Sequence, residues 1–118
     1  MVSFTYKTTN ANIDASWQEL TERKFSGLEK HLPENVEARF EMEFEKVTAS
    51  QTGNIFRVEA NLSYAGELVR AEATMGSFEE AIDEVQAELD KRLRRANKKR
   101  NNLFRRGGRA IKRMMRRG

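Results

Sequence analysis

The chain has 118 residues, with 22 lysines and arginines against 18 aspartates and glutamates, and it contains no cysteine. A chain of this length supports one domain with a modest core that needs neither a metal nor a disulfide, and the lack of cysteine excludes a disulfide framework, a thiolate zinc site and a cysteine nucleophile. It has no apolar run long enough to span a membrane and no signal-peptide pattern at its N-terminus, so we expect a cytoplasmic protein.

The N-terminal part of the chain predicts a strand followed by a helix. Residues 2–7 alternate between apolar and polar side chains, which is the period-two pattern of a half-buried strand. Asp14 can cap a helix that runs to about Leu32, since apolar side chains recur there at helical spacing. These side chains are Trp17, Leu20, Phe25, Leu28 and Leu32. Pro33 then ends the helix, because the residue before a proline is disfavoured in the helical region.

Three further strands are predicted in the middle of the chain. Residues 36–47 form the next strand, because apolar side chains alternate without a break from Val36 to Phe44, opposite glutamates and one arginine. A polar stretch turns the chain, and residues 55–64 continue the alternation. Ala65 and Gly66 form a tight-turn signal, so residues 67–75 should return as the next strand of a meander.

A second helix is predicted to begin near Ser77. Ser77 and Glu80 have the spacing of a capping box, in which a hydroxyl and a carboxylate satisfy free N–H groups of the first turn. Apolar residues then recur every three or four positions, in a stripe that weakens after Leu93. They are Phe78, Ala81, Ile82, Val85, Leu89, Leu93 and Ala96. From Arg94 onward we expect the helix to run past the sheet into solvent, until the glycine pair 107–108 ends it or acts as a hinge.

These elements predict an α+β fold with the order β-α-β-β-β-α. The expected architecture is a two-layer sandwich, in which both helices cover one face of a four-stranded sheet and the glutamate-rich positions line the other face. We expect residues 1–106 to form the domain, including an extended C-terminal helix, and residues 107–118 to form a basic flexible tail.

Residues that could carry catalysis or bind a metal have simpler interpretations. Glu41, Glu43 and Glu45 share one strand face, but an open sheet face would not desolvate them, so we interpret them as a solvated surface. His31 has no nucleophile motif nearby and is predicted to lie on the surface of the first helix. The chain has no phosphate-binding loop and no hydrolase motif. We therefore expect no enzyme activity, no metal, no cofactor and no small-molecule substrate.

The positive charge is concentrated at the C-terminal end of the chain. Residues 1–90 contain all 18 acidic groups and 8 of the 22 basic ones, for a net charge of −10, whereas residues 91–118 contain the other 14 basic groups and no acid. Like charges at helical spacing repel one another, and we expect an external polyanion to offset this repulsion, since the segment has no acid of its own. Phosphates do so with release of counterions. A solubilising tail is the alternative.

Motifs along the chain resemble those of one protein family. Residues 24–30, KFSGLEK, are similar to a KFxxLE[KR] stretch in the first helix of the ribosome hibernation promoting factors, also called ribosome-associated inhibitor or sigma-54 modulation proteins. Residues 69–73 and 77–83 look like that family's last strand and the start of its second helix. Residues 89–93 lie where the family has an L-x-R-Q-L stretch. The resemblance covers about residues 2–100 and includes the predicted order of elements.

The resemblance implies a short-form, non-enzymatic translation inhibitor that docks on 16S rRNA in the channel between head and body of the small ribosomal subunit. It would block the mRNA and tRNA sites there and store idle ribosomes, and we expect it to be a monomer away from the ribosome. Cations on both helices would contact rRNA phosphates. They are Lys24, Lys30, Lys91, Arg92, Arg94, Arg95, Lys98, Lys99, Arg100, Arg105 and Arg106. Glu88, Ala96 and Asn97 depart from the family pattern, which usually has a lysine and a His-Lys pair at these positions.

Two other functions stay open on the residues alone. A general double-stranded RNA or DNA binder could also set a pair of helices against the shape of a duplex. A membrane-surface protein would use apolar residues that lie among the C-terminal arginines. These residues are Leu103, Phe104, Ile111, Met114 and Met115. We expect no membrane partner, and competition among small subunits, naked duplex RNA and anionic vesicles separates the three functions.

Overall fold

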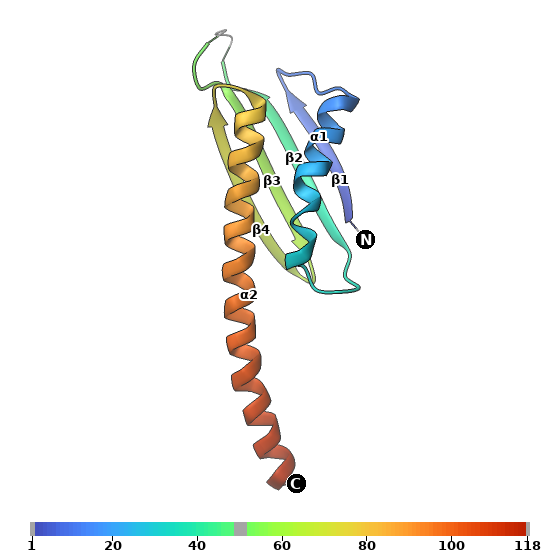
Figure 1. Cartoon of the computed structure of the whole chain (residues 1–118), viewed down its shortest axis with the longest axis vertical. Coiled ribbons are helices and arrows are strands. Elements are labelled where there is room, and N and C mark those ends of the chain that lie inside the picture. Colours follow the sequence, from blue (N-terminus) through green and yellow to red (C-terminus); the bar gives the residue numbers. More distant parts are fainter. Residues whose placement is uncertain (1, 49–51, 118) are drawn as a thin grey trace.

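The computed structural model describes residues 2–48 and 52–117, with side chains described as far as residue 99. The elements follow the predicted order, which confirms the α+β fold (Figure 1). They are β1 (Val2–Thr9), α1 (Ala15–Ser26), the short 3-10 helix η1 (Glu29–His31), β2 (Ala38–Lys46), β3 (Phe56–Tyr64), β4 (Glu67–Met75) and α2 (Phe78–Arg117).

The four strands form one mixed sheet with the order β1-β2-β3-β4. β1 and β2 are parallel, because the chain crosses through α1 before it returns to the sheet. The other two pairs are antiparallel. The turn between β3 and β4 has positive φ at both central residues, 48° at Ala65 and 78° at Gly66. Positive φ at both positions is typical of the two-residue hairpin turn whose twist matches that of the strands.

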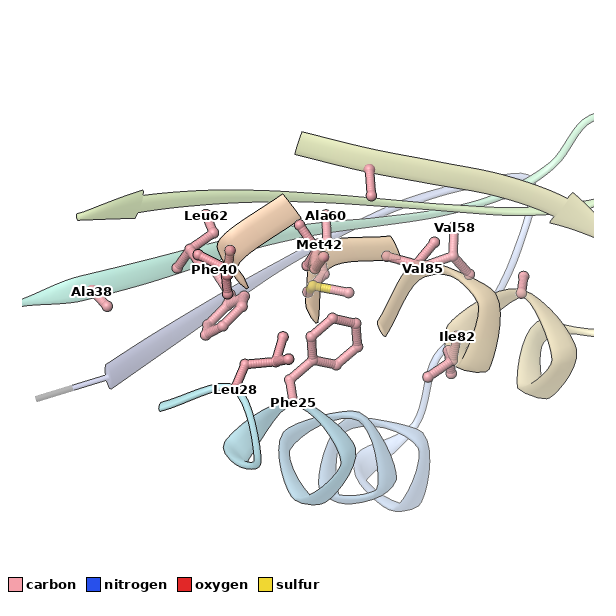
Figure 2. Close-up of a cluster of buried hydrophobic side chains, with 14 of the residues drawn as sticks. Phe25, Leu28, Ala38, Phe40, Met42, Val58, Ala60, Leu62, Ile82 and Val85 are labelled. Atoms are coloured by element: carbon pink, nitrogen blue, oxygen red, sulfur yellow. The ribbon is translucent and has the colours of Figure 1, made fainter. Parts of the chain in front are cut away.

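Both helices pack on one face of the sheet and enclose a single core (Figures 1 and 2). Figure 2 shows Phe25 and Leu28 pointing from the first helical region toward Phe40 and Met42 of β2. The rings of Phe25 and Phe40 meet edge to face, with centroids 5.6 Å apart. The alternating residues of β2 and β3 that face this layer are buried, so the period-two patterns of these strands are confirmed.

The first helix is shorter than predicted. α1 ends at Ser26, because Gly27 is a poor helix former and the hydrogen bonds after it join each residue to the third one before it. The Leu28 amide donates to the Phe25 carbonyl at 3.0 Å. The chain therefore reaches His31 through a 3-10 turn, while Leu28 still lies in the core as its spacing predicted.

The second helix does not end at the glycine pair 107–108, which was one of the two predicted roles of this pair. Its start is as expected, since the Glu80 amide donates to the Ser77 hydroxyl at 3.2 Å. α2 then continues through the glycine pair 107–108 to Arg117, so the pair does not end it. Glycine weakens a helix by about 1 kcal/mol but keeps its N–H donor, so the hydrogen-bond ladder can run through it. The division into a domain 1–106 and a flexible tail 107–118 stays a prediction.

The length of α2 gives the molecule its shape. The molecule extends 68 × 25 × 19 Å, and the C-terminal half of α2 projects beyond the end of the sheet (Figure 1). Leu89 and Leu93 are fully buried, and they are the last core residues of this helix among those whose burial is described. The fold therefore holds α2 at one end and presents its other end to solvent.

Candidate nucleic-acid interface

The predicted cations of α2 lie where the helix leaves the sheet. All six of those whose side chains are described are exposed. They are Lys91, Arg92, Arg94, Arg95, Lys98 and Lys99. The structure thus brings these residues together on one short, accessible stretch of helix, on both sides of the buried Leu93 in the sequence.

Two of these cations are paired within α2, with acids that lie just before the acid-free segment 91–118. The Arg92 Nε lies 2.9 Å from Glu88 Oε1, and the Arg94 Nε lies 3.0 Å from Asp90 Oδ2. The segment 91–118 itself has no acid, but a contact over one helical turn reaches back four residues, into the acidic part of the same helix. Each pair reduces the charge that the arginine offers to an external phosphate.

The other four cations have no ion pair within the part of the chain whose side chains are described. They are Lys91, Arg95, Lys98 and Lys99, and we call them the cationic stripe. Their spacing of i, i+4, i+7 and i+8 places them on one face of a helix. Since each residue adds about 1.5 Å of rise, the stripe is about 12 Å long.

The stripe faces away from α1. Asp83, Asp90 and Asn97 recur every seven residues and therefore share a different flank of α2, and each of them contacts α1 or η1. Asp83 forms an ion pair with Lys24, and Asp90 and Asn97 contact His31. At 3.6 residues per turn, the stripe lies on a different side of α2 from these contacts.

The remaining predicted contacts fall into three groups. The Lys24 ammonium is engaged with Asp83 and joins α1 to α2, so it serves the fold. Lys30 is exposed on η1 and has no ion pair among the residues described. Arg100, Arg105 and Arg106 lie on the α2 backbone, but their side chains are outside the described residues.

His31 is the residue that sequence reasoning placed least well. It is half-buried in η1, and its Nε2 lies 2.6 Å from Asp90 Oδ1. This hydrogen bond holds the pKa of the Asp90 carboxyl below its ordinary value, and the nearby charges of Arg94 and Lys30 act in the same direction. Asp90 is 59 residues away in the sequence, and no local pattern links the two positions.

The open face of the sheet carries a network of ion pairs around Arg57. Its guanidinium contacts Glu43 at 2.7 Å, Glu72 at 2.8 Å and Glu45 at 3.2 Å, and it also contacts Glu59. Burial alone would lower the pKa of Arg57, but the bonds to these carboxylates raise it. Burial also raises the pKa of Glu59, but the bonds from Asn61 and Arg57 outweigh this effect and lower it. The predicted glutamate-rich face is thus confirmed, and most of its charge is compensated.

Metal binding and membrane insertion both require features that can be sought in the described part of the chain. Within residues 2–48 and 52–117, no three histidines, cysteines, aspartates or glutamates are grouped so that they could hold a metal ion. Over the same ranges, no helix is both long and apolar enough to cross a membrane.

Solved structures of two bacterial proteins share this fold. The N-terminal domain of protein Y from Thermus thermophilus is 19% identical, with a TM-score of 0.59 over 80% of this chain and 93% of that domain. A ribosomal subunit interface protein from Coxiella burnetii is 20% identical, with a TM-score of 0.61 over 80% of this chain and 96% of the other. No curated protein sequence matches the chain.

The sequence itself matches one family over most of its length. The match extends over residues 4–101, which include all but the first two residues of β1, the other strands, α1 and more than half of α2. The family is described as "Sigma 54 modulation protein / S30EA ribosomal protein". This agrees with the resemblance of residues 24–30 and 77–83. The chain therefore belongs to the sigma 54 modulation protein and S30EA ribosomal protein family.

Proposed function

We propose that this protein is a non-enzymatic ribosome-binding translation inhibitor of the hibernation type. It docks on 16S rRNA in the mRNA–tRNA channel of the small subunit and stabilises idle ribosomes. The single observation that carries the proposal is the cationic stripe at the exposed end of α2, in a chain that belongs to a ribosomal protein family. The name of the Coxiella burnetii relative, a ribosomal subunit interface protein, supports the same direction.

The charge distribution supports a defined orientation on RNA. Residues 1–90 carry a net charge of −10, and the 14 basic groups that follow lie on residues 91–118, so RNA attracts one end of the molecule and repels the other. The projecting half of α2 would therefore enter the rRNA groove while the sheet stays away from the phosphates. If the four cations of the stripe each touch one phosphate, they contribute about 3 units to the salt slope of binding.

Sedimentation with purified ribosomes tests the proposal. The protein should comigrate with small subunits and with whole ribosomes in a sucrose gradient at low salt, and it should dissociate as the salt concentration rises. Equal masses of naked duplex RNA and of anionic vesicles serve as the competing partners. Comigration with duplex RNA but with no ribosomal particle would support a general duplex binder, and recovery with vesicles alone would support a membrane-surface protein.

A cell-free translation assay tests the inhibitory part of the proposal. Adding the protein should lower the yield of a reporter as the ratio of protein to ribosome approaches one. An inhibitor that occupies the mRNA and tRNA sites should also lose potency when the ribosomes are first loaded with mRNA and initiator tRNA. Equal inhibition of loaded and empty ribosomes would contradict docking in that channel.

A further inference from the structure

Three side chains meet at the point where α2 leaves the body of the protein. His31 Nε2 lies 2.6 Å from Asp90 Oδ1, and the Asn97 side-chain amide donates to the His31 backbone carbonyl at 2.8 Å. These contacts join residues that are 59 and 66 positions apart in the sequence. They hold η1 against one flank of α2.

Among the residues whose side chains are described, this junction is the last place where the body holds the helix. The side chains of His31 and Asp90 are only 15% and 25% exposed, so the contact is largely shielded from solvent. The other oxygen of the Asp90 carboxylate forms an ion pair with Arg94, which helps to fix the orientation of the carboxylate. Lys98 and Lys99, which follow Asn97, are exposed. The helix beyond Asn97 therefore behaves as a lever whose direction is set at this point.

A small change in this direction has a large effect at the far end. About 20 residues of α2 follow Asn97, which corresponds to about 30 Å of helix. A tilt of about 10° at the junction would move the far end by about 5 Å. A hydrogen bond between a cation and a phosphate tolerates much less than this, since its length is about 2.7–2.9 Å. Cations on the projecting helix can therefore meet several phosphates at once only if the junction is firm.

We propose that His31, Asp90 and Asn97 form a bracket that fixes the direction of the projecting half of α2. They are positioning residues for the RNA contacts and touch no RNA themselves. This role rests on the proposed function, but the bracket itself is a property of the free protein. It can therefore be tested with and without ribosomes.

The first test measures the direction of the helix in the free protein. The chain has no cysteine, so cysteines introduced in place of Glu19 on α1 and Arg106 on α2, which precedes the glycine pair 107–108, can carry nitroxide labels at two defined positions. Pulsed electron paramagnetic resonance then gives the distribution of distances between the labels. The distribution should be narrow in the parent protein and at least twice as wide after Asn97→Ala or Asp90→Ala.

A matched control separates the bracket from the loss of any acid on α2. Glu88→Ala also removes a carboxylate that is paired with the arginine four residues later, but Glu88 has no contact with η1 among the described residues. This variant should keep the narrow distribution. His31→Ala should widen it, and His31→Gln, which retains an amide donor in the same region, should restore part of the original shape. An unchanged distribution in Asn97→Ala and Asp90→Ala would overturn the bracket.

The second test measures binding of the unlabelled proteins to small ribosomal subunits. Asn97→Ala should weaken binding by about tenfold, the size expected for a lost hydrogen bond and its consequences. The salt slope should stay the same, since this variant removes no phosphate contact. Replacing Lys98 with glutamine should instead lower the slope by about one unit. Circular dichroism and a thermal melt show whether each variant is folded.

The results separate failure of the bracket from failure of the proposed function. If the distribution of label distances broadens and the affinity falls while the salt slope stays the same, both parts of the inference hold. If the distribution of label distances broadens but the affinity for small subunits does not change, the positioning role is wrong. If the parent protein does not bind ribosomal subunits, the proposed function fails and the positioning role fails with it, whereas the label distances still decide whether the bracket exists.

Discussion

The two halves of α2 have opposite surroundings and opposite charge. Residues 78–90 pack against the sheet and contain six acidic groups and no lysine or arginine. Residues 91–117, most of which project beyond the sheet, contain 14 basic groups and no acid. The first half is fixed by its buried apolar stripe, and the second half has no such anchor after Leu93 among the residues whose burial is described. One helix thus separates what stabilises the fold from what can bind a partner.

Charge reversal of the cationic stripe should have the largest effect, since it should abolish binding by the projecting part of α2 while the packed part stays folded. Changing Lys91, Arg95, Lys98 and Lys99 to glutamate replaces four attractive contacts by four repulsive ones, so binding to small subunits should fall by more than about a thousandfold. The thermal stability should change little, because these positions are exposed and unpaired among the described side chains. A binding titration at fixed salt measures the loss.

A control of equal net charge shows whether position matters. The same reversal at four cations of the body lowers the net charge of the protein by the same amount. These cations are Lys7, Arg23, Arg39 and Lys46. They lie outside α2, so this variant should retain most of the affinity. Equal losses in both variants would mean that only the total charge counts and that the stripe is not the interface.

Removal of the end of α2 should have the next largest effect. Deleting residues 107–118 removes five cations, which are Arg109, Lys112, Arg113, Arg116 and Arg117. If all five touch phosphates, the slope of log affinity against log salt should decrease by about 4 units. An unchanged slope would show that this segment is a solvated appendage, so that the cations before residue 107 carry the electrostatic part of binding.

The architecture was predictable because its signals are local. Period-two alternation in residues 36–47 and 55–64, the turn at Ala65 and Gly66, and the Ser77 cap each depend on neighbours in the sequence, and all are confirmed. The end of α1 was misplaced because burial of Leu28 and Leu32 is compatible with either an α-helical or a 3-10 path. Hydrophobic spacing shows which residues are buried but leaves the exact hydrogen-bond pattern open.

The candidate site was predictable only as a charged segment. The sequence shows that residues 91–118 are basic, but the state of each cation depends on partners elsewhere in the fold. Lys24 is engaged by Asp83, and Arg94 by an aspartate that also holds His31. Two of these three contacts cross between elements that are far apart in the chain, so no spacing rule reveals them.

Truncation of the last buried leucine should affect stability and sharpen the boundary between the halves. Leu93 is fully buried, so Leu93→Ala should lower the free energy of unfolding by about 2–4 kcal/mol. Lys98→Ala, only five residues later, should change it by less than about 0.5 kcal/mol. Urea unfolding curves measure both values. A small effect of Leu93→Ala would place the boundary before this residue.

The smallest expected effect concerns Asp90, which lies at the boundary itself. The hydrogen bond from His31 and the charges of Arg94 and Lys30 lower its pKa in the folded protein, so the native state holds this proton less tightly than the unfolded chain does. The stabilisation is therefore fully present above the unfolded pKa of about 3.9 and is lost as the pH falls through the lower, folded value. Asp90→Asn should cost about 0.5–1 kcal/mol at pH 7, and the difference from the parent protein should shrink steadily below about pH 4. Urea unfolding of both proteins from pH 7 to pH 3 tests this, and a difference that does not depend on pH would show that the Asp90 charge contributes nothing to the junction.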